Sequence, residues 1–253
     1  MISLIVPIFN EEESIDSLVA ALSEFALSYD PNLQIILIND ASTDDTKRVL
    51  EVKLQQMNQN DRLRKQFLIL ENPSNLGYGA SLKRGIRSAS HDTVAIIDAD
   101  LTYSLSDLDR CLKIFRAEKL DMVVGARTGK FYVGNATKKN LRKILKVIVE
   151  YMSGQEIPDI NSGLRVFKRR KAERYLALLS NRFSFTTSLT LIVMLTGGIV
   201  KYIPIQYAKR AGGSKVKLAS DSVRTLGLVI AVSFFFTPLR IIYPFLLLMT
   251  VIS

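Results

Sequence analysis

Two aspartates separated by one residue follow the most apolar stretch in the N-terminal half of the chain. Asp98 and Asp100 come directly after Val94–Ile97, and side chains so spaced in extended backbone point the same way. Two neighbouring carboxylates at a buried strand end repel each other unless a cation neutralises them. Mg²⁺ or Mn²⁺ binds such oxygens and bridges them to a diphosphate. The motif predicts a metal site, and a solvated pair of loop acids is the alternative.

Polar residues also follow the first two apolar runs. Pro7, Asn10 and Glu11 come after the first run, and Asp40 closes the second. An acid in that place accepts hydrogen bonds from a ribose or a base. Asn10 also fits a helix N-cap, and capping explains the polar residues around Asp40 about as well. Both stretches are therefore candidate nucleotide contacts with a plain structural alternative.

A glycine-rich turn follows the third apolar run. Gly77 and Gly79 allow the backbone to approach a ligand closely, and the next helix carries Lys83. The spacing is neither that of a P-loop nor that of G-x-G-x-x-G. We treat Gly79 and Lys83 as candidate cofactor-binding residues, with an ordinary turn as the alternative.

The second half of the chain carries side chains that suit a phosphate ligand. Arginine makes bidentate contacts with phosphate oxygens, and lysine supplies a point charge. The candidates are Arg127, Arg165, Arg210 and Lys215. Asp159 could orient an arginine or touch the metal site, and Asn161 and Ser162 could hydrogen-bond a sugar.

Short apolar runs alternate with helical patterns over most of the chain, which predicts an α/β protein with a mostly parallel, doubly wound sheet. The expected strands are Ile2–Val6, Leu33–Ile38, Phe67–Leu70, Val94–Ile97, Met122–Val124, Ser162–Lys168 and Ile199–Tyr207. The expected later helices are Lys138–Tyr151, Lys171–Leu179 and Ser188–Leu195.

The C-terminal segment is unusually apolar. Between Leu226 and Ile252 the only charged residue is Arg240. Each of the two apolar runs is shorter than the ~20 residues that span a bilayer, and an arginine at mid-membrane is costly. We predict an interfacial helix, a break at Pro238 and the start of a transmembrane helix. A buried hairpin in a soluble protein is the alternative.

Charge and composition narrow the function further. The net charge of +10 divides into −5 for residues 1–127 and +15 for residues 128–253, so a basic half would face an anionic partner. One Cys and one His exclude a disulfide framework and a Cys/His zinc site. Any His-dependent triad would have to use His91.

The order of these motifs resembles that of inverting family 2 glycosyltransferases. Asn10-Glu11 follows the first strand, Asp40 the second, the glycine turn the third and Asp98-x-Asp100 the fourth. The resemblance covers residues 1–215 and implies a GT-A catalytic domain, with residues 216–253 as the membrane-associated part. It also implies that Pro7, Asn10, Glu11 and Asp40 line the nucleotide site and that Mg²⁺ or Mn²⁺ binds Asp98 and Asp100.

Three later stretches resemble the polyprenyl-phosphate branch of that family, which includes dolichyl-phosphate mannose synthase-like enzymes. They are residues 124–127, residues 159–168 and residues 209–215, the last of which contains Arg210, Ser214 and Lys215. The chain departs from the pattern at Thr102, where many members follow the acidic motif differently. It also lacks the Q-x-x-R-W motif of processive synthases.

We therefore expect a glycosyltransferase that moves a hexose from a nucleotide diphosphate sugar, of the GDP-mannose or UDP-glucose type, to a polyprenyl phosphate. The resemblance places its catalytic domain on the cytoplasmic side of a membrane. A phosphate monoester is already a dianion at neutral pH, so it needs cations more than a general base. The alternatives are transfer to a sugar or protein hydroxyl, a basic nucleic-acid-binding module and a non-catalytic membrane protein.

Overall fold

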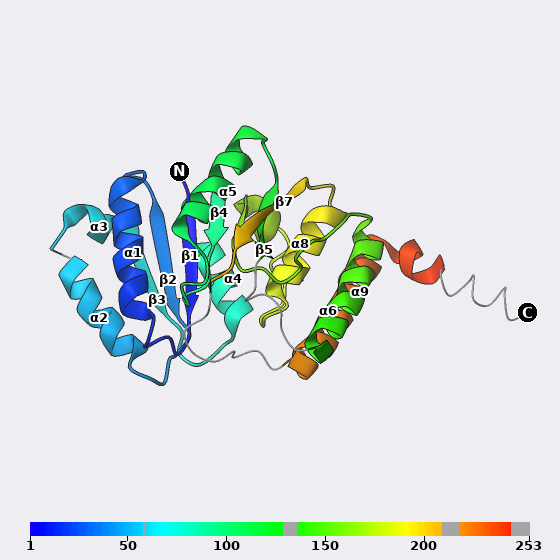
Figure 1. The fold of residues 1–253 in the computed structure, drawn as a ribbon, viewed down its shortest axis with the longest axis horizontal. Helices are drawn as coiled ribbons and strands as arrows, with labels where there is room; N and C mark the ends of the chain where they lie inside the picture. Colours follow the sequence, from blue (N-terminus) through cyan, green and yellow to red (C-terminus); the bar gives the residue numbers. More distant parts are fainter. Residues whose placement is uncertain (58, 129–135, 209–217, 244–253) are drawn as a thin grey trace, which may run out of the picture.

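The computed structural model describes residues 1–57, 59–128, 136–208 and 218–243. In these residues seven strands form one sheet, in the order β3-β2-β1-β4-β6-β5-β7 (Figure 1). They are β1 Ser3–Ile8, β2 Gln34–Asn39, β3 Phe67–Glu71, β4 Thr93–Ile96, β5 Met122–Thr128, β6 Arg165–Lys168 and β7 Val200–Gln206. Only β6 is antiparallel to its neighbours, β4 and β5. The predicted α/β fold with a mostly parallel sheet is confirmed.

Helices cover both faces of the sheet. One hydrophobic cluster contains residues of α1 Ile15–Ser28, α2 Thr46–Met57, α3 Asp61–Gln66 and α5 Leu105–Ala117. The other contains residues of α4 Tyr78–Ser88, α6 Ala136–Ser153, α7 Arg169–Glu173, α8 Phe185–Leu195 and α9 Leu218–Phe236. Strand β1 shows why: Leu4 and Val6 enter the first cluster, and Ile5 enters the second. Alternate side chains of a strand point to opposite faces, so a strand that is apolar throughout is buried on both.

Strand β1 continues through Pro7, where the sequence predicted its end. Pro7 pairs in register with Ile38 of β2, whereas pairing with β4 stops at Ile5. The Ile5 carbonyl accepts from the amide of Ile97, so the odd-numbered residues of β1 face β4. The backbone nitrogen of Pro7 therefore faces the region beyond the end of β4. Its missing N–H costs no hydrogen bond between the strands. Pro7 is buried inside the strand.

The predicted helix Lys171–Leu179 is wrong in its bounds. Helix α7 ends at Glu173, and turns follow it. The amides of Tyr175, Leu176 and Leu178 donate to carbonyls three residues earlier, which is the tighter pattern of a helix end. Leu176 and Leu179 are still buried. The apolar spacing therefore predicted the burial of these side chains correctly, but it predicted a continuous helix where the backbone forms turns.

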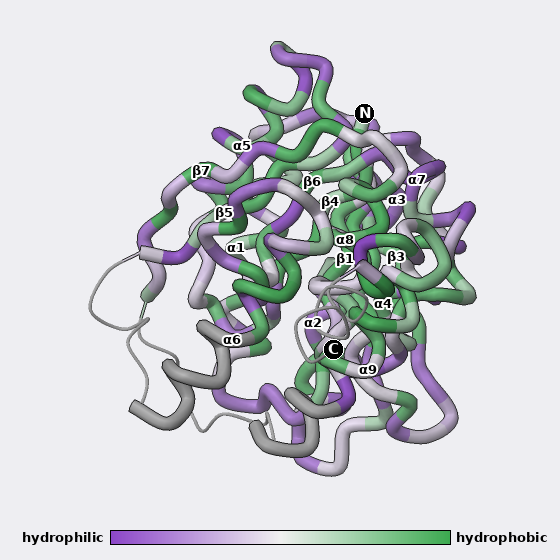
Figure 2. The backbone as a smooth tube through the Cα atoms, turned by 90° about the vertical axis from the view of Figure 1, so that its right-hand side faces the viewer, coloured by the Kyte–Doolittle hydropathy of each residue, from purple (hydrophilic) through white to green (hydrophobic). Residues whose placement is uncertain are grey.

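The C-terminal segment begins as the predicted helix. Helix α9 lies beside α6 and α8 on one face of the sheet (Figures 1 and 2), and a break at Thr237 separates it from helical residues 238–243. Within the described ranges, which end at residue 243, no helix is long and apolar enough to cross a membrane. The predicted start of a transmembrane helix falls mainly on residues 244–253, outside the described residues.

The antiparallel strand β6 determines where the site forms. Parallel strands β1, β2, β4 and β5 end at one edge of the sheet, and an antiparallel strand begins at that edge. Arg165, the first residue of β6, pairs with Ile96 at the end of β4. The residues before β6 therefore lie beside the residues that follow β4 and β5.

The fit of α4 against the sheet provides a stability test. A Cβ on Gly85 would lie 2.5 Å from Cγ2 of Ile5 and 3.1 Å from Cδ1 of Ile38. We expect Gly85→Ala to lower the free energy of unfolding by about 1–3 kcal/mol through overpacking. A Cβ on Gly227 in α9 meets no atom within 4 Å. Gly227→Ala should therefore raise the free energy of unfolding by about 0.5–1 kcal/mol, because alanine favours a helix more than glycine does. Urea unfolding measures both changes, and equal effects would contradict this packing.

Candidate active site

The two aspartates of the acidic motif lie in the turn after β4. Oδ1 of Asp98 accepts a hydrogen bond of 2.9 Å from the hydroxyl of Tyr78. Oδ1 of Asp100, which is buried, accepts from the backbone amide (3.2 Å) and hydroxyl (2.6 Å) of Thr102. Thr102, the residue that departs from the family pattern, therefore holds a carboxylate of the motif.

These carboxylates fit a divalent cation that is shared with a substrate. Among the described residues no group of three or more His, Cys, Asp or Glu side chains is placed to hold a metal ion. Mg²⁺ in phosphate-transfer sites is bound through one or two carboxylates, with substrate phosphates and water as the other ligands. Asp98 and Asp100 supply that donor set when a diphosphate completes it.

Arg127 and Asp159 form the strongest ion pair of the site. Nε of Arg127 lies 2.7 Å from Oδ2 of Asp159, and Nη2 lies 2.9 Å from Oδ1. The side chains are 13% and 1% exposed, and the guanidinium also lies over the ring of Tyr207. Burial raises the pKa of Asp159, but the hydrogen bonds and charge of Arg127 outweigh burial and hold that pKa below its usual value. Asp159 thus orients Arg127 and remains ionised.

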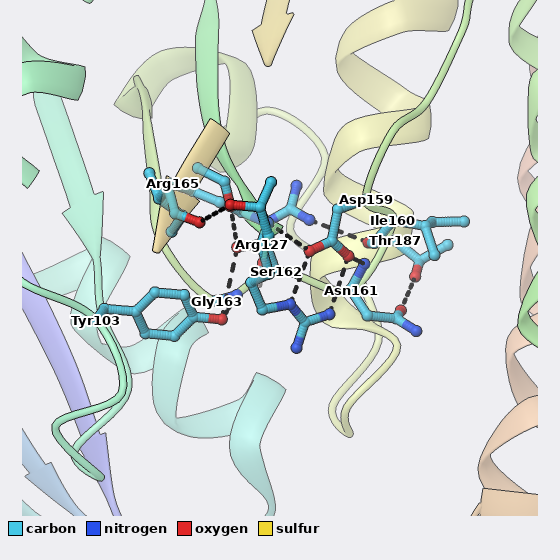
Figure 3. Close-up of polar contacts among 12 residues, drawn as sticks. Tyr103, Arg127, Asp159, Ile160, Asn161, Ser162, Gly163, Arg165 and Thr187 are labelled. Atoms are coloured by element: carbon cyan, nitrogen blue, oxygen red, sulfur yellow. Dashed lines mark hydrogen bonds and ion pairs between the residues drawn. The ribbon is translucent and has the colours of Figure 1, made fainter. Parts of the chain in front are cut away.

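Asn161, Ser162 and Gly163 are fixed in the same loop (Figure 3). Oδ1 of Asn161 accepts from the hydroxyl of Thr187. Ser162 is buried and donates to the carbonyl of Gly125, while the amide of Gly163 donates to the hydroxyl of Tyr103. Of the two residues expected to meet a sugar, only Asn161 is exposed.

The position of Arg165 corrects its predicted role. Its guanidinium is fully buried and donates to the carbonyls of Ile160 and Ser162 and to the hydroxyl of Thr190. The sequence predicts a clamp on the acceptor phosphate. The guanidinium instead reaches the backbone of the 159–163 loop and binds its carbonyls (Figure 3). Arg165 is therefore a positioning residue.

The glycine-rich turn packs closely against another loop. A Cβ on Gly79 would lie 2.8 Å from the carbonyl carbon of Asn181 and 2.9 Å from the carbonyl oxygen of Arg182. Lys83 donates to Oδ1 of Asn181 at 2.7 Å. The start of α4 thus packs against the loop before α8, and the cofactor-binding role of Gly79 and Lys83 stays a prediction.

Asp40 likewise binds the protein itself. It is 3% exposed, and its carboxylate accepts from the amides of Leu76 (2.9 Å) and Gly77 (2.8 Å) and from the side chain of Asn72 (2.7 Å). Hydrogen bonds to both oxygens hold the loop between β3 and α4 in place. These bonds give Asp40 a structural role, and its contact with a nucleotide stays a prediction.

Asn10 and Glu11 lie where β1 and β2 end together. Asn10 has a left-handed backbone (φ 53°), and its side-chain oxygen accepts from the amide of Thr43 at 2.8 Å. The amide of Glu11 donates to the hydroxyl of Thr46. These bonds join the first two loops at the sheet edge, with both side chains partly exposed. The remaining predicted contacts, Arg210, Ser214 and Lys215, lie outside the described residues.

Sequence reasoning missed Tyr78, Tyr103, Asn181 and Thr187. Tyr78 lies inside the glycine turn and Tyr103 lies just after the acidic motif. Their positions next to recognised motifs could have marked both tyrosines as candidate site residues. Asn181 and Thr187 have no such signal, because the residues they contact are distant in the sequence.

The sequence profile described as Glycosyl transferase family 2 matches residues 3–176, which is most of the chain. This chain is a family 2 glycosyltransferase. The match covers β1 to β6 and every predicted site residue except the three in residues 209–217.

Three curated relatives show how this glycosyltransferase compares with characterised ones. Dodecaprenyl-phosphate galacturonate synthase of Rhizobium johnstonii is 26% identical, with 92% of this chain and 67% of the relative covered. Dolichyl-phosphate beta-glucosyltransferase of Trichomonas vaginalis is 27% identical, over 86% and 68%. Undecaprenyl-phosphate 4-deoxy-4-formamido-L-arabinose transferase of Pseudomonas syringae is 22% identical, over 76% and 57%. The match thus spans between about half and two thirds of these longer proteins.

Solved structures share the fold of this glycosyltransferase. Glucosyl-3-phosphoglycerate synthase of Mycobacterium tuberculosis, bound to Mn²⁺, UDP and its product, has a TM-score of 0.69 and 17% identity over 92% of this chain and 80% of that one. The same enzyme with Mg²⁺ and UDP also gives 0.69, at 18% identity over 92% and 79%. The likeness supports the GT-A fold.

The buried ion pair gives a pH-dependent prediction. We expect Asp159→Asn to lower the free energy of unfolding by about 3–5 kcal/mol at neutral pH, because Arg127 loses a buried charged partner. The folded-state pKa of Asp159 lies below its unfolded value, so the contribution is complete above about pH 4 and is lost as the pH falls through the folded-state pKa. Urea unfolding of both proteins from neutral pH to about pH 3 should show the difference shrinking. A constant difference would contradict an ionised Asp159.

Proposed function

We propose that this glycosyltransferase moves a hexose from a nucleotide diphosphate sugar to a polyprenyl phosphate. The named relatives act on polyprenyl or dolichyl phosphates, which supports the acceptor class. The observation that carries the proposal is the pairing of Asp159 with Arg127. A carboxylate that is buried in an ion pair with a lowered pKa is a weak general base. A phosphate monoester, with a second pKa of about 6, arrives already charged.

Asp98 and Asp100 would hold the divalent cation together with the donor diphosphate. When bound, that cation stabilises the negative charge of the departing nucleotide diphosphate. An oxygen of the lipid phosphate forms a bond to C1 of the sugar as the bond from C1 to the diphosphate breaks, which inverts the configuration. Arg127, held in place by Asp159, lies at the end of β5 to attract the acceptor phosphate.

Asn161 would contact the acceptor phosphate or the sugar. Its side-chain oxygen accepts from Thr187, which directs the NH₂ group as the donor. Ser162 acts through the backbone because its hydroxyl is already bonded to Gly125. Arg210, Ser214 and Lys215 remain predicted phosphate contacts, and placement of the catalytic domain on the cytoplasmic side also remains a prediction.

The outer face of α6, α9 and residues 238–243 would rest on the membrane. We define this apolar face by its exposed side chains: Val147, Tyr151, Ile230, Phe234, Phe235, Leu239, Ile242 and Tyr243. The opposite side of α9 buries Val229 and Val232 in the core, so the helix packs on the catalytic domain. Exposed apolar side chains on neighbouring helices are typical of an interaction surface.

Arg240 does not interrupt this apolar face. Its guanidinium donates to the carbonyls of Tyr151 and Met152 at the end of α6, and the hydroxyl of Tyr151 donates to the carbonyl of Arg240. A cation at a helix C-terminus is favourable because the last carbonyls lack partners. On sequence grounds this charge makes a membrane-spanning segment costly, and here it has a role within the protein.

The catalytic proposal predicts the loss of transfer in one variant. Asp100→Ala should reduce formation of lipid-linked sugar by more than about 100-fold, because charge on the leaving diphosphate is no longer stabilised. The assay uses radiolabelled nucleotide sugars with undecaprenyl or dolichyl phosphate, with and without Mn²⁺. Asp109→Ala, which removes an aspartate paired with Lys113 on α5, is the control and should remain active. Full activity of Asp100→Ala would refute the metal role.

The membrane proposal predicts weaker binding when the apolar face becomes polar. Replacing Phe234 and Phe235 together by Ser should weaken binding to lipid vesicles by at least about 10-fold, because each ring contributes on the order of 1.5 kcal/mol or more when buried in lipid. Val52→Ser, at a 45% exposed position on α2, should leave binding unchanged. Vesicle flotation measures both, and equal binding of the two variants would overturn the assignment of this face.

A further inference from the structure

The turn Gly77-Tyr78-Gly79 is a recognised motif that the proposed function does not use. Its glycines leave room for the backbone of residues 180–182, as the near contact of each Cβ position with Asn181 shows. The amide of Ala80 donates to the carbonyl of Asn181 at 3.0 Å. Lys83, one turn further along α4, donates to Oδ1 of the same residue. Asn181 therefore caps the start of α4 through its backbone and binds its first turns through its side chain.

This docking places the residue between the two glycines. The ring of Tyr78 stacks on that of Phe183, with centroids 5.6 Å apart and planes inclined by 18°. The Tyr78 hydroxyl donates to Oδ1 of Asp98 at 2.9 Å. A phenol is protonated at neutral pH, so it is the donor in this bond to the carboxylate.

The backbone of Gly163 lies close to the other side of the Asp98 carboxylate. A Cβ on Gly163 would meet Oδ2 of Asp98 first and would lie 2.7 Å from both Cγ and Oδ1. The carboxylate therefore lies directly against the backbone of that residue. The amide of Gly163 is itself fixed by the hydroxyl of Tyr103. Asp98 is thus held between Tyr78 and Gly163, which limits the rotation of its carboxylate.

We infer that Tyr78 is a positioning residue that orients the carboxylate of Asp98 for the divalent cation, and that the loop before α8 fixes Tyr78. This inference rests on the proposed metal role of Asp98. The Tyr78 hydroxyl engages Oδ1 on one side of the carboxylate and the backbone of Gly163 closes the other side, so the two together fix the orientation of the carboxylate. Hydrogen bonds that orient a metal-binding carboxylate typically change metal affinity by 10–100-fold. On this inference the glycine turn serves the cation through Tyr78.

The test is a Mn²⁺ titration of the full chain saturated with UDP or GDP, followed by electron paramagnetic resonance of the free ion. Tyr78→Phe keeps the ring that stacks on Phe183 and removes only the hydroxyl. We expect its dissociation constant for Mn²⁺ to rise by about 10–100-fold, while calorimetry without Mn²⁺ shows nucleotide binding unchanged. Tyr175→Phe, a tyrosine that packs on Phe236 of α9, is the matched control and should bind Mn²⁺ as the unmodified chain does.

A second variant tests the loop. Asn181→Ala removes the side chain bound by Lys83 and touches neither carboxylate, so it should weaken Mn²⁺ binding by a smaller factor, with a circular dichroism spectrum like that of the unmodified chain. Mn²⁺ affinities of Tyr78→Phe within twofold of the Tyr175→Phe control would overturn the inference while leaving the proposed function intact. Failure of the unmodified chain to bind Mn²⁺ with either nucleotide would overturn both.

Discussion

The rest of the site depends on the hydrogen bonds that the buried guanidinium of Arg165 donates. A fully buried arginine is costly unless its donors are satisfied, and here they bond to the carbonyls of Ile160 and Ser162 and to the hydroxyl of Thr190. Because β6 runs antiparallel to β4 and β5, Arg165 lies at the edge where those strands end. One side chain therefore connects the 159–163 loop to the sheet and to α8, beside the acidic motif.

The loops at this edge hold one another in place before any substrate arrives. Asp40 fixes the loop that precedes α4, Asn181 docks on α4 itself, and Tyr78 carries that restraint to Asp98. Preorganised groups cost no reorganisation at the moment of reaction, which is where electrostatic catalysis gains its advantage. Most polar residues after the strands thus build a rigid frame, while Asp98, Asp100, Arg127 and Asn161 are the groups that we assign to substrates.

The sequence predicted what depends on local pattern. Apolar runs identified all seven strands of the described residues, and the order of the motifs identified the family. It could not predict roles set by partners far along the chain: Lys83 binds a residue 98 positions away, and Asp40 binds amides more than 30 positions away. The direction of Arg165 was equally hidden, because a strand's first residue can face the site or the core. Pro7 was misjudged because the sequence does not show where β4 ends.

Because Asp159 is committed to Arg127, we expect the acceptor to be a phosphate that needs no general base. The most direct measurement compares a polyprenyl phosphate with the corresponding polyprenol as acceptors, under the same saturating radiolabelled donor and Mn²⁺. We expect transfer to the phosphate and none to the alcohol. Transfer to the polyprenol, or to a soluble saccharide, at a rate equal to that with the phosphate would contradict this expectation.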